Sequence, residues 1–221
     1  MDLICTISDQ CVRSLKEVFP EEAEKVRLVP NISLPSMITR LAEEPIDMPS
    51  VHGFIFATIG QVSYNKGIDM IIAASRILKQ NGIDFSWLLV GSIATAEGYV
   101  DEVMQSDLKN NIYFMGVQSN PYPFMKCADI IVHPSRFEGK SVTLDESKIL
   151  CKPIVVTNFT TVGDQFENEV NASICEMTGE AVAQTILKLI ENKEWRDRYI
   201  TNLKDELVLN PEFTFIKEIF D

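Results

Sequence analysis

From residue 54 onward, apolar runs of strand length alternate with segments of helical period. The strands are expected at 54–59, 85–90, 112–115, 129–133 and 154–157, with helices between and after them at 66–80, 99–108, 122–127, 142–150 and 161–167. Trp87-Leu88-Leu89-Val90 is apolar throughout, which is typical of a strand covered by helices on both faces. The pattern therefore predicts an α/β fold with a doubly wound, Rossmann-like parallel sheet.

The two ends of the chain differ from this pattern. Residues 1–8 read as a short strand, 9–19 as a helix and 26–29 as a strand, before a polar, proline-containing stretch at 30–49. Only helices are expected after Gly179, at 180–190, 195–207 and 213–220. We therefore expect residues 1–50 to be the end of another domain plus a linker, and 51–221 to be the Rossmann-like domain with C-terminal helices.

The charge balance excludes several classes of function. The 221 residues carry a formal net charge of -12, which disfavours a sequence-independent grip on nucleic acid and a membrane role based on basic patches. No segment has the roughly 18 consecutive apolar residues of a transmembrane helix, and the N-terminus lacks the basic start of a secretory signal. A soluble, cytoplasmic protein is expected.

Cysteine and histidine are too sparse for a metal centre. The five cysteines are odd in number, widely spaced and without a C-x-x-C pair, so they are interpreted as buried small side chains in a reducing compartment. With only two histidines, a histidine-based metal site is not expected.

The most informative motif spans 135–146. Glu138 and Glu146 lie eight positions apart around a turn of Gly139, Lys140 and Ser141 that leads into a predicted helix. Free backbone N–H groups in such a turn can bind a diphosphate, and the helix N-terminus adds about half a positive charge. Carboxylates on either side can accept hydrogen bonds from sugar hydroxyls. The motif predicts a nucleotide-sugar site; the alternative is a capping box of Thr143 and Glu146 with Glu138 exposed in a loop.

Two further segments follow predicted strands, where ligands bind in open parallel sheets. In the segment from Gly60 to Gly67, Lys66 is placed to reach a diphosphate; the alternative is a solvated helix start after a turn at Gly60. The segment Asn120-Pro121-Tyr122 reads as a helix start with Asn as the N-cap and Pro at the first helical position.

Four other residues have simpler interpretations. Arg136 is either a phosphate or sugar ligand or one partner of a surface ion pair. His133 is interpreted as a satisfied core or edge histidine and Asp129 as a residue that orders the preceding turn. Cys151 has no histidine nearby in the sequence, so a nucleophilic thiol is not expected.

The motif around Glu138 and Glu146, followed by Lys152-Pro153-Ile154-Val155-Val156-Thr157, resembles the donor-site signature of the retaining nucleotide-sugar glycosyltransferases of the group 1 class (family 4), which have the GT-B fold. The resemblance implies a C-terminal donor-binding domain preceded by a short remnant of the N-terminal domain, most of which is then missing. It also implies a set of donor-binding residues, namely Gly60, Gln61, Lys66, Val117, Asn120, Tyr122, Glu138, Gly139, Lys140, Ser141 and Glu146.

The resemblance assigns roles within that set. Glu138 takes the sugar hydroxyls, the turn after it the phosphates and Glu146 the ribose, while backbone groups near Val117 read the base. Lys66 and Glu138 are the expected catalytic residues. The family usually has an arginine where this chain has the uncharged Gln61, so weaker donor binding or turnover is expected.

The implied reaction is transfer of a sugar from a nucleoside diphosphate, with UDP-sugar the expected donor, to an acceptor hydroxyl with retention. It needs no cofactor or metal and belongs to polysaccharide or glycoconjugate synthesis. The acceptor, a glycan or lipid-linked glycan, would bind through the missing domain, and the intact enzyme could sit at the inner membrane face. Two alternatives remain open: a non-catalytic nucleotide-sugar-binding module or subunit of a split enzyme, and a nucleotide-sugar epimerase, which requires acid–base residues not evident in the sequence.

Overall fold

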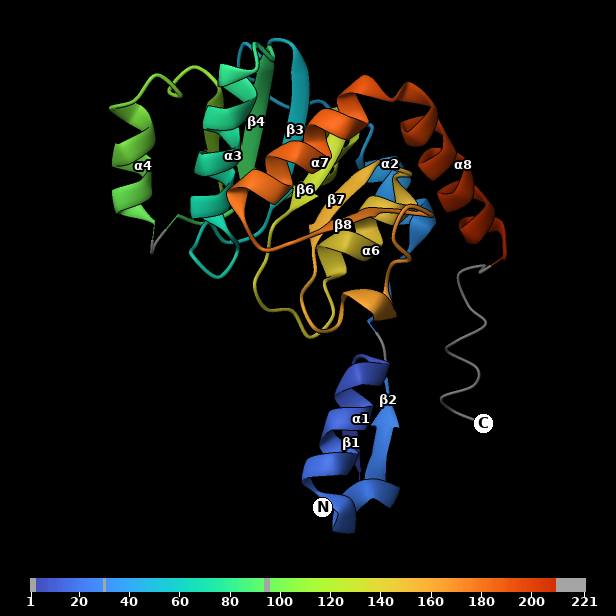
Figure 1. Cartoon of the computed structure of the whole chain (residues 1–221). Helices are drawn as coiled ribbons and strands as arrows, with labels where there is room; N and C mark the ends of the chain where they lie inside the picture. The colour runs from blue at the N-terminus through green and yellow to red at the C-terminus, as the bar shows by residue number, and fades with distance from the viewer. Residues whose placement is uncertain (1–2, 30, 94–95, 210–221) are drawn as a thin grey trace.

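The computed structural model describes residues 3–29, 31–93 and 96–209. Its main feature is a parallel sheet of six strands in the order β5-β4-β3-β6-β7-β8 (Figure 1). The strands are β3 (Phe54–Ile59), β4 (Phe85–Val90), β5 (Ile112–Gly116), β6 (Ile130–His133), β7 (Ile154–Thr157) and β8 (Ser173–Cys175). The predicted parallel sheet is therefore confirmed, with one additional strand, β8.

Helices cover both faces of this sheet. One face carries α3 (Ile68–Gln80), α4 (Glu97–Met104) and α7 (Gly179–Glu191), and the other carries α2 (Pro35–Leu41), α5 (Tyr122–Cys127) and α6 (Val142–Ile149). The last helix, α8 (Lys193–Leu209), packs Tyr199 into the first core and also contacts α6 on the second face. Because side chains alternate along a strand, Trp87 packs in one core and its neighbour Leu88 in the other, both fully buried. The continuous apolar runs are explained by this two-sided burial, and the doubly wound prediction is confirmed.

Several element predictions need correction. The edge strand β8 was not expected, because three residues are too few to show a period. The helix predicted at 99–108 begins and ends earlier, as α4, and 161–167 contains only the 3-10 turn η2 (Val162–Asp164). The predicted helix at 213–220 lies outside the described residues. The stretch 30–49 contains the unexpected helix α2, which starts at Pro35 and buries Ile38.

The N-terminal residues form a small unit of their own. It comprises β1 (Ile4–Thr6), α1 (Asp9–Val18), the 3-10 turn η1 (Pro20–Lys25) and β2 (Val26–Leu28), with β1 and β2 paired in parallel. In Figure 1 this unit lies next to the η2 region. Asp164 makes the polar contact: its Oδ2 accepts a hydrogen bond from the Gln10 amide at 2.8 Å, and its Oδ1 lies 3.3 Å from Arg13. The division into domains at residue 50 remains a prediction.

The strand order reverses at β3, which pairs with β4 on one side and β6 on the other. The loops that follow β3 and β6 therefore leave the sheet side by side, at the crevice where open α/β sheets bind ligands. Their approach is very close at Gly67, which has a φ of +78° and where a Cβ atom would lie 2.1 Å from the carbonyl oxygen of Pro134. Two of the three sequence motifs thus meet at one place.

The cysteines differ from expectation. All five are free thiols, but Cys5 is exposed and the other four are only partly buried, so the expectation of buried thiols is wrong. Most lie at or next to the ends of helices and strands, where neighbouring elements cover the side chain only in part.

Among the described residues, no helix is long and apolar enough to cross a membrane.

Candidate functional site

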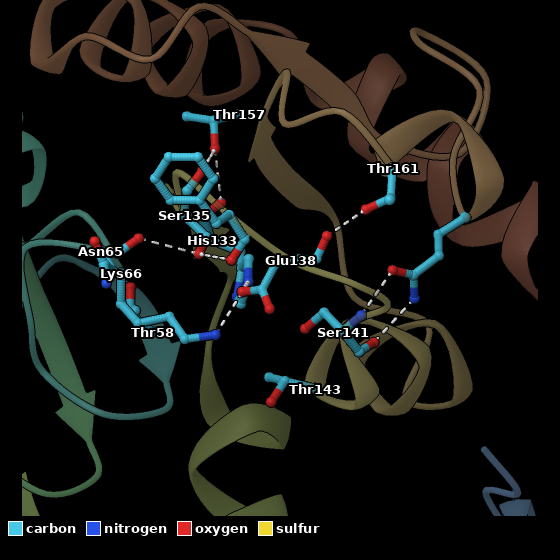
Figure 2. A network of polar contacts seen from close by, with 12 residues as sticks. Thr58, Asn65, Lys66, His133, Ser135, Glu138, Ser141, Thr143, Thr157 and Thr161 are labelled. Atoms are coloured by element: carbon cyan, nitrogen blue, oxygen red, sulfur yellow. Dashed lines mark hydrogen bonds and ion pairs between the residues drawn. The ribbon is translucent and has the colours of Figure 1, made fainter. Parts of the chain in front are cut away.

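Three charged or polar side chains converge in the crevice. Lys66 Nζ lies 2.5 Å and His133 Nε2 2.7 Å from the same atom, Oε1 of Glu138. Figure 2 shows Lys66, from the loop after β3, and His133, at the end of β6, both directed at Glu138. The Glu138 side chain is 10% exposed and that of His133 4% exposed. Glu138 is therefore not the exposed loop residue of the alternative interpretation, and Lys66, 31% exposed and paired with Glu138, is not a solvated helix start.

The surroundings of Glu138 favour its ionised form. Burial alone would raise the pKa of this carboxyl, but the hydrogen bonds from His133 and Lys66 and the charge of His133 lower it to about 2. An ionised carboxylate can only accept, so His133 Nε2 carries the proton in this contact. The interpretation of His133 as a satisfied core histidine is confirmed, whereas its contact with Glu138 was not expected from the sequence.

The loop that carries Glu138 is tied to the loop after β3. The Arg136 amide donates to the carbonyl of Asn65 at 2.8 Å, and its guanidinium binds both carboxylate oxygens of Asp69 at 2.8 and 2.7 Å. The same guanidinium lies over the Tyr64 ring, 3.7 Å from its centroid. Of the two interpretations of Arg136, the ion pair is the one observed, and its function is to join the two loops.

The turn after Glu138 differs from the prediction in one respect. The Ser141 amide is not free: it donates to Gln165 Oε1 at 3.0 Å. Within the described part of the chain, the amides of Gly139 and Lys140 have no hydrogen-bond acceptor, and no side chain caps the N-terminus of α6. Lys140 Nζ is 3.8 Å from Asp145. The unpaired amides of the turn and of the first turn of α6 can still bind an anion.

Glu146 is not part of a capping box. Its Oε1 accepts a hydrogen bond from the Tyr122 hydroxyl at 2.8 Å, so α6 and α5 are joined at this point. Burial and the charge of Asp145 raise the pKa of Glu146, while the Tyr122 hydrogen bond opposes that shift. Burial and the contact with Glu146 raise the pKa of Tyr122 to about 12. The structure thus pairs two residues that the sequence analysis had assigned separately to the donor site.

Asn120 has a role different from the predicted N-cap. The helix α5 begins at Tyr122 with Pro121 as its N-cap, although Asn120 Oδ1 does accept from the Tyr122 amide at 3.1 Å. Its Nδ2 donates to the carbonyl of Leu41 and to Glu44, both at 2.8 Å, which fixes the end of α2 against this loop. Val117 is 76% exposed and therefore open to a ligand.

The loop after β3 forms the other side of the site. Gly60, Gln61, Lys66 and His133 line a common pocket, and the Gln61 side chain is exposed. Asp129, expected to order the preceding turn, instead accepts from the Ile55 amide of β3 at 2.8 Å, because β6 begins directly beside that strand. No group of three or more His, Cys, Asp or Glu side chains in the described ranges could hold a metal ion.

Two site residues were missed. Thr161 Oγ1 donates to the carbonyl of Glu138 at 2.8 Å, and Gln165 binds Ser141. Both lie more than twenty positions beyond their partners, in a segment whose sequence shows no motif. Only the packing of η2 against the start of α6 brings them to the site.

The amino-acid sequence of the chain is similar to those of known proteins. The profile of the family described as "Glycosyl transferases group 1" matches residues 49–206. The chain is 23% identical over 164 residues to the uncharacterized glycosyltransferase MJ1059 of Methanocaldococcus jannaschii, covering 72% of this chain and 40% of that protein. It is 28% identical over 147 residues to the capsular polysaccharide biosynthesis glycosyltransferase CapM of Staphylococcus aureus, covering 65% and 38%. The match thus spans about two fifths of these relatives.

Solved structures share the fold. S. aureus TarM, in complex with fondaparinux, alpha-GlcNAc-glycerol and UDP, superposes with a TM-score of 0.81 at 15% identity, over 100% of this chain and 43% of that one. Anabaena Alr3699/HepE in complex with UDP gives a TM-score of 0.79 at 17% identity, over 98% and 61%. At these identities the likeness establishes the architecture alone, which is that of GT-B glycosyltransferases.

Proposed function

The chain belongs to the group 1 glycosyl transferases, and on that basis we propose that it binds a nucleoside-diphosphate sugar at the carboxyl ends of β3 and β6. The reaction proposed is transfer of the sugar to an acceptor hydroxyl with retention, as in family 4 of the GT-B enzymes. The observation that carries the proposal is the convergence of Lys66 and His133 on Glu138, beside the uncapped N-terminus of α6.

The groups around this point match the parts of such a donor. The ammonium of Lys66 and the unpaired amides of Gly139 and Lys140 suit the diphosphate. Glu138, ionised and fixed, suits the sugar hydroxyls. Glu146 and Tyr122 suit the ribose, with the exposed backbone near Val117 beside the base.

The chemistry follows from these charges. As the bond to the sugar breaks, negative charge develops on the diphosphate, and Lys66 together with the α6 N-terminus stabilises it without a metal ion. Glu138 is a weak base, because a carboxyl with a pKa of about 2 holds a proton poorly. It therefore serves to orient the sugar, and neither glutamate needs to act as a nucleophile.

The identities of the donor and the acceptor are further proposals, supported by the relatives. UDP is the nucleotide named in the TarM and HepE structures, which supports a UDP-sugar as donor. CapM acts in capsular polysaccharide biosynthesis, which supports a glycan or lipid-linked glycan as acceptor in polysaccharide assembly. A cytoplasmic location, with the intact enzyme at the inner membrane face, fits such a substrate.

A second candidate is a nucleotide-sugar-binding module without transfer activity, or one subunit of a split enzyme. Gln61 favours it, since an exposed, uncharged side chain lines the pocket beside Lys66 and adds no charge for the diphosphate. Binding and transfer measured on the same preparation separate the two candidates.

The test is calorimetric titration of UDP, GDP and ADP and their sugars into the purified chain. Saturable binding of one nucleotide is expected, with a loss of roughly tenfold in Glu146→Gln, because a charged hydrogen bond to the ribose is removed. Glu102→Gln is the matched control, since Glu102 lies on the surface and pairs with Arg76 there. Absence of binding by the unaltered chain, or an equal loss in both variants, would count against the donor site.

A further inference from the structure

Gln165 is one of the few buried polar side chains near the donor site, with 6% of its surface exposed. It follows η2 and contacts the start of α6 through three hydrogen bonds. Its Oε1 accepts from the Ser141 amide at 3.0 Å, and its Nε2 donates to the Ser141 carbonyl at 2.9 Å and to Asp145 Oδ1 at 2.8 Å. An amide side chain that binds both backbone groups of one residue holds that residue in place.

The orientation of this amide is fixed by its partners. The Ser141 N–H requires an acceptor, whereas the Ser141 carbonyl and the Asp145 carboxylate both require donors. Only one arrangement of the Gln165 oxygen and nitrogen satisfies all three partners. A hydrophobic side chain satisfies none of them, and a carboxylate satisfies only the first.

The three bonds act on the two parts of the site that decide anion binding. They set the direction of Ser141, the N-cap of α6, and hence of the amides next to it in the turn and in the first turn of the helix. They also hold the negative charge of Asp145, whose other oxygen lies 3.8 Å from Lys140. A negative charge close to a diphosphate opposes its binding. Holding the Asp145 carboxylate at Gln165 therefore favours diphosphate binding.

Residues 161–165 also hold Glu138, the residue whose carboxylate is proposed to bind the sugar. Thr161 donates to the carbonyl of Glu138 at 2.8 Å (Figure 2), and Gln165 binds Ser141, so the residues on both sides of the Gly139-Lys140 turn are anchored from residues 161–165. We propose that Gln165 is a positioning residue for donor binding, which aligns the N-terminus of α6 with the diphosphate and keeps Asp145 away from it. The inference rests on the proposed function and adds a residue that touches no donor atom.

The test uses two substitutions in the full chain. Gln165→Met keeps the length of the side chain and removes every hydrogen bond, so the affinity for the nucleoside diphosphate should fall roughly tenfold. Gln165→Glu introduces a carboxyl beside Asp145. When ionised it repels Asp145 and donates to neither the Ser141 carbonyl nor Asp145; when protonated it still accepts from the Ser141 amide and can donate one hydrogen bond.

The readout is the affinity ratio of variant to unaltered chain, measured by calorimetry with UDP, GDP and ADP at pH 8 and pH 5. For Gln165→Glu, a deficit of about tenfold or more at pH 8 should shrink to about threefold or less at pH 5. A purely structural role would not give this pH-dependent recovery. Asn111→Leu is the control, because Asn111 is similarly buried, at 7%, and bonds the Phe85 carbonyl of β4.

The outcomes separate the two proposals. If the unaltered chain binds no nucleotide, the proposed function fails and this inference fails with it. If the unaltered chain binds but Gln165→Met binds equally well, the donor site stands and Gln165 has no part in it. A deficit in Gln165→Glu that is the same at both pH values, or an equal deficit in Asn111→Leu, would also overturn the positioning role.

Discussion

Lys66 and His133 meet at a single atom, the Oε1 oxygen of Glu138, 2.5 and 2.7 Å away. The positive charge nearest the proposed diphosphate is thus partly neutralised by the carboxylate proposed to bind the sugar. The groups proposed to bind the two halves of the donor are therefore electrostatically coupled, and a change in either alters the other.

This coupling predicts opposite effects on two ligands for Glu138→Gln. Lys66 loses its anionic partner, so UDP should bind several-fold more tightly, while the sugar loses a charged acceptor. The ratio of affinities for UDP-sugar and UDP should therefore fall about tenfold. Calorimetric titration of UDP and of a UDP-sugar into the unaltered chain and into Glu138→Gln measures this ratio. A parallel fall in both affinities, together with a lower midpoint of thermal unfolding, would mean that Glu138 only stabilises the loops.

Gln61→Arg should strengthen donor binding. Gln61 is exposed and lines the same pocket as Lys66, so a guanidinium at this position adds a second cation beside the diphosphate without displacing a buried group. We expect a gain of about five- to tenfold in affinity at low salt that shrinks as ionic strength rises. Gln184→Arg, at an exposed position on α7, controls for the change in net charge. Equal gains in both variants would contradict a local effect.

His52 predicts a pH dependence of stability. Its Nε2 lies 2.9 Å from the Asn110 carbonyl and its Nδ1 2.5 Å from Asp84, and these contacts raise its pKa above 6.5 although burial opposes the shift. Because the folded-state pKa is the higher one, the protonated ring contributes stability below about pH 6.5 that is lost as pH rises through the folded value. For so exposed a pair the loss should be about 0.5 kcal/mol or less.

Chemical denaturation at pH 5.5 and pH 8.5 measures this effect, with His52→Gln as the reference. The difference in unfolding free energy between the two pH values should be smaller in the variant by the contribution of His52. A variant with the same pH profile as the unaltered chain would show that His52 does not titrate against Asp84.

The sequence predicted the sheet well because its strands are buried on both faces. Every residue of Phe85–Val90 is buried and all but Ser86 are apolar, so the apolar run marks the strand directly. The short edge strand Ser173–Cys175 gives no such signal, and α2 was hidden by the prolines that flank it and begin it. The local sequence pattern therefore identified the buried central strands and missed the edge strand β8 and the helix α2.

The candidate site also contains residues that the sequence identified and residues that it could not identify. Lys66 and Glu138 were found because each lies in a loop that follows a strand at the carboxyl edge of the sheet, and Glu146 because it lies in the helix that begins after the Glu138 loop. The partners that orient them could not be found: Gln165 reaches Ser141 from 24 positions away, and the contact of His133 with Glu138 depends on the path of the loop between them. Contacts of this kind arise only from tertiary packing.

Gly67 approaches Pro134 so closely that even a methyl group there would collide with the Pro134 carbonyl, and Arg136 joins the same two loops through Asn65 and Asp69. The two loops are consequently shaped as a matched pair. Specificity for the proposed donor could therefore not be re-engineered by grafting one loop from a relative; a working exchange would have to transfer both loops together.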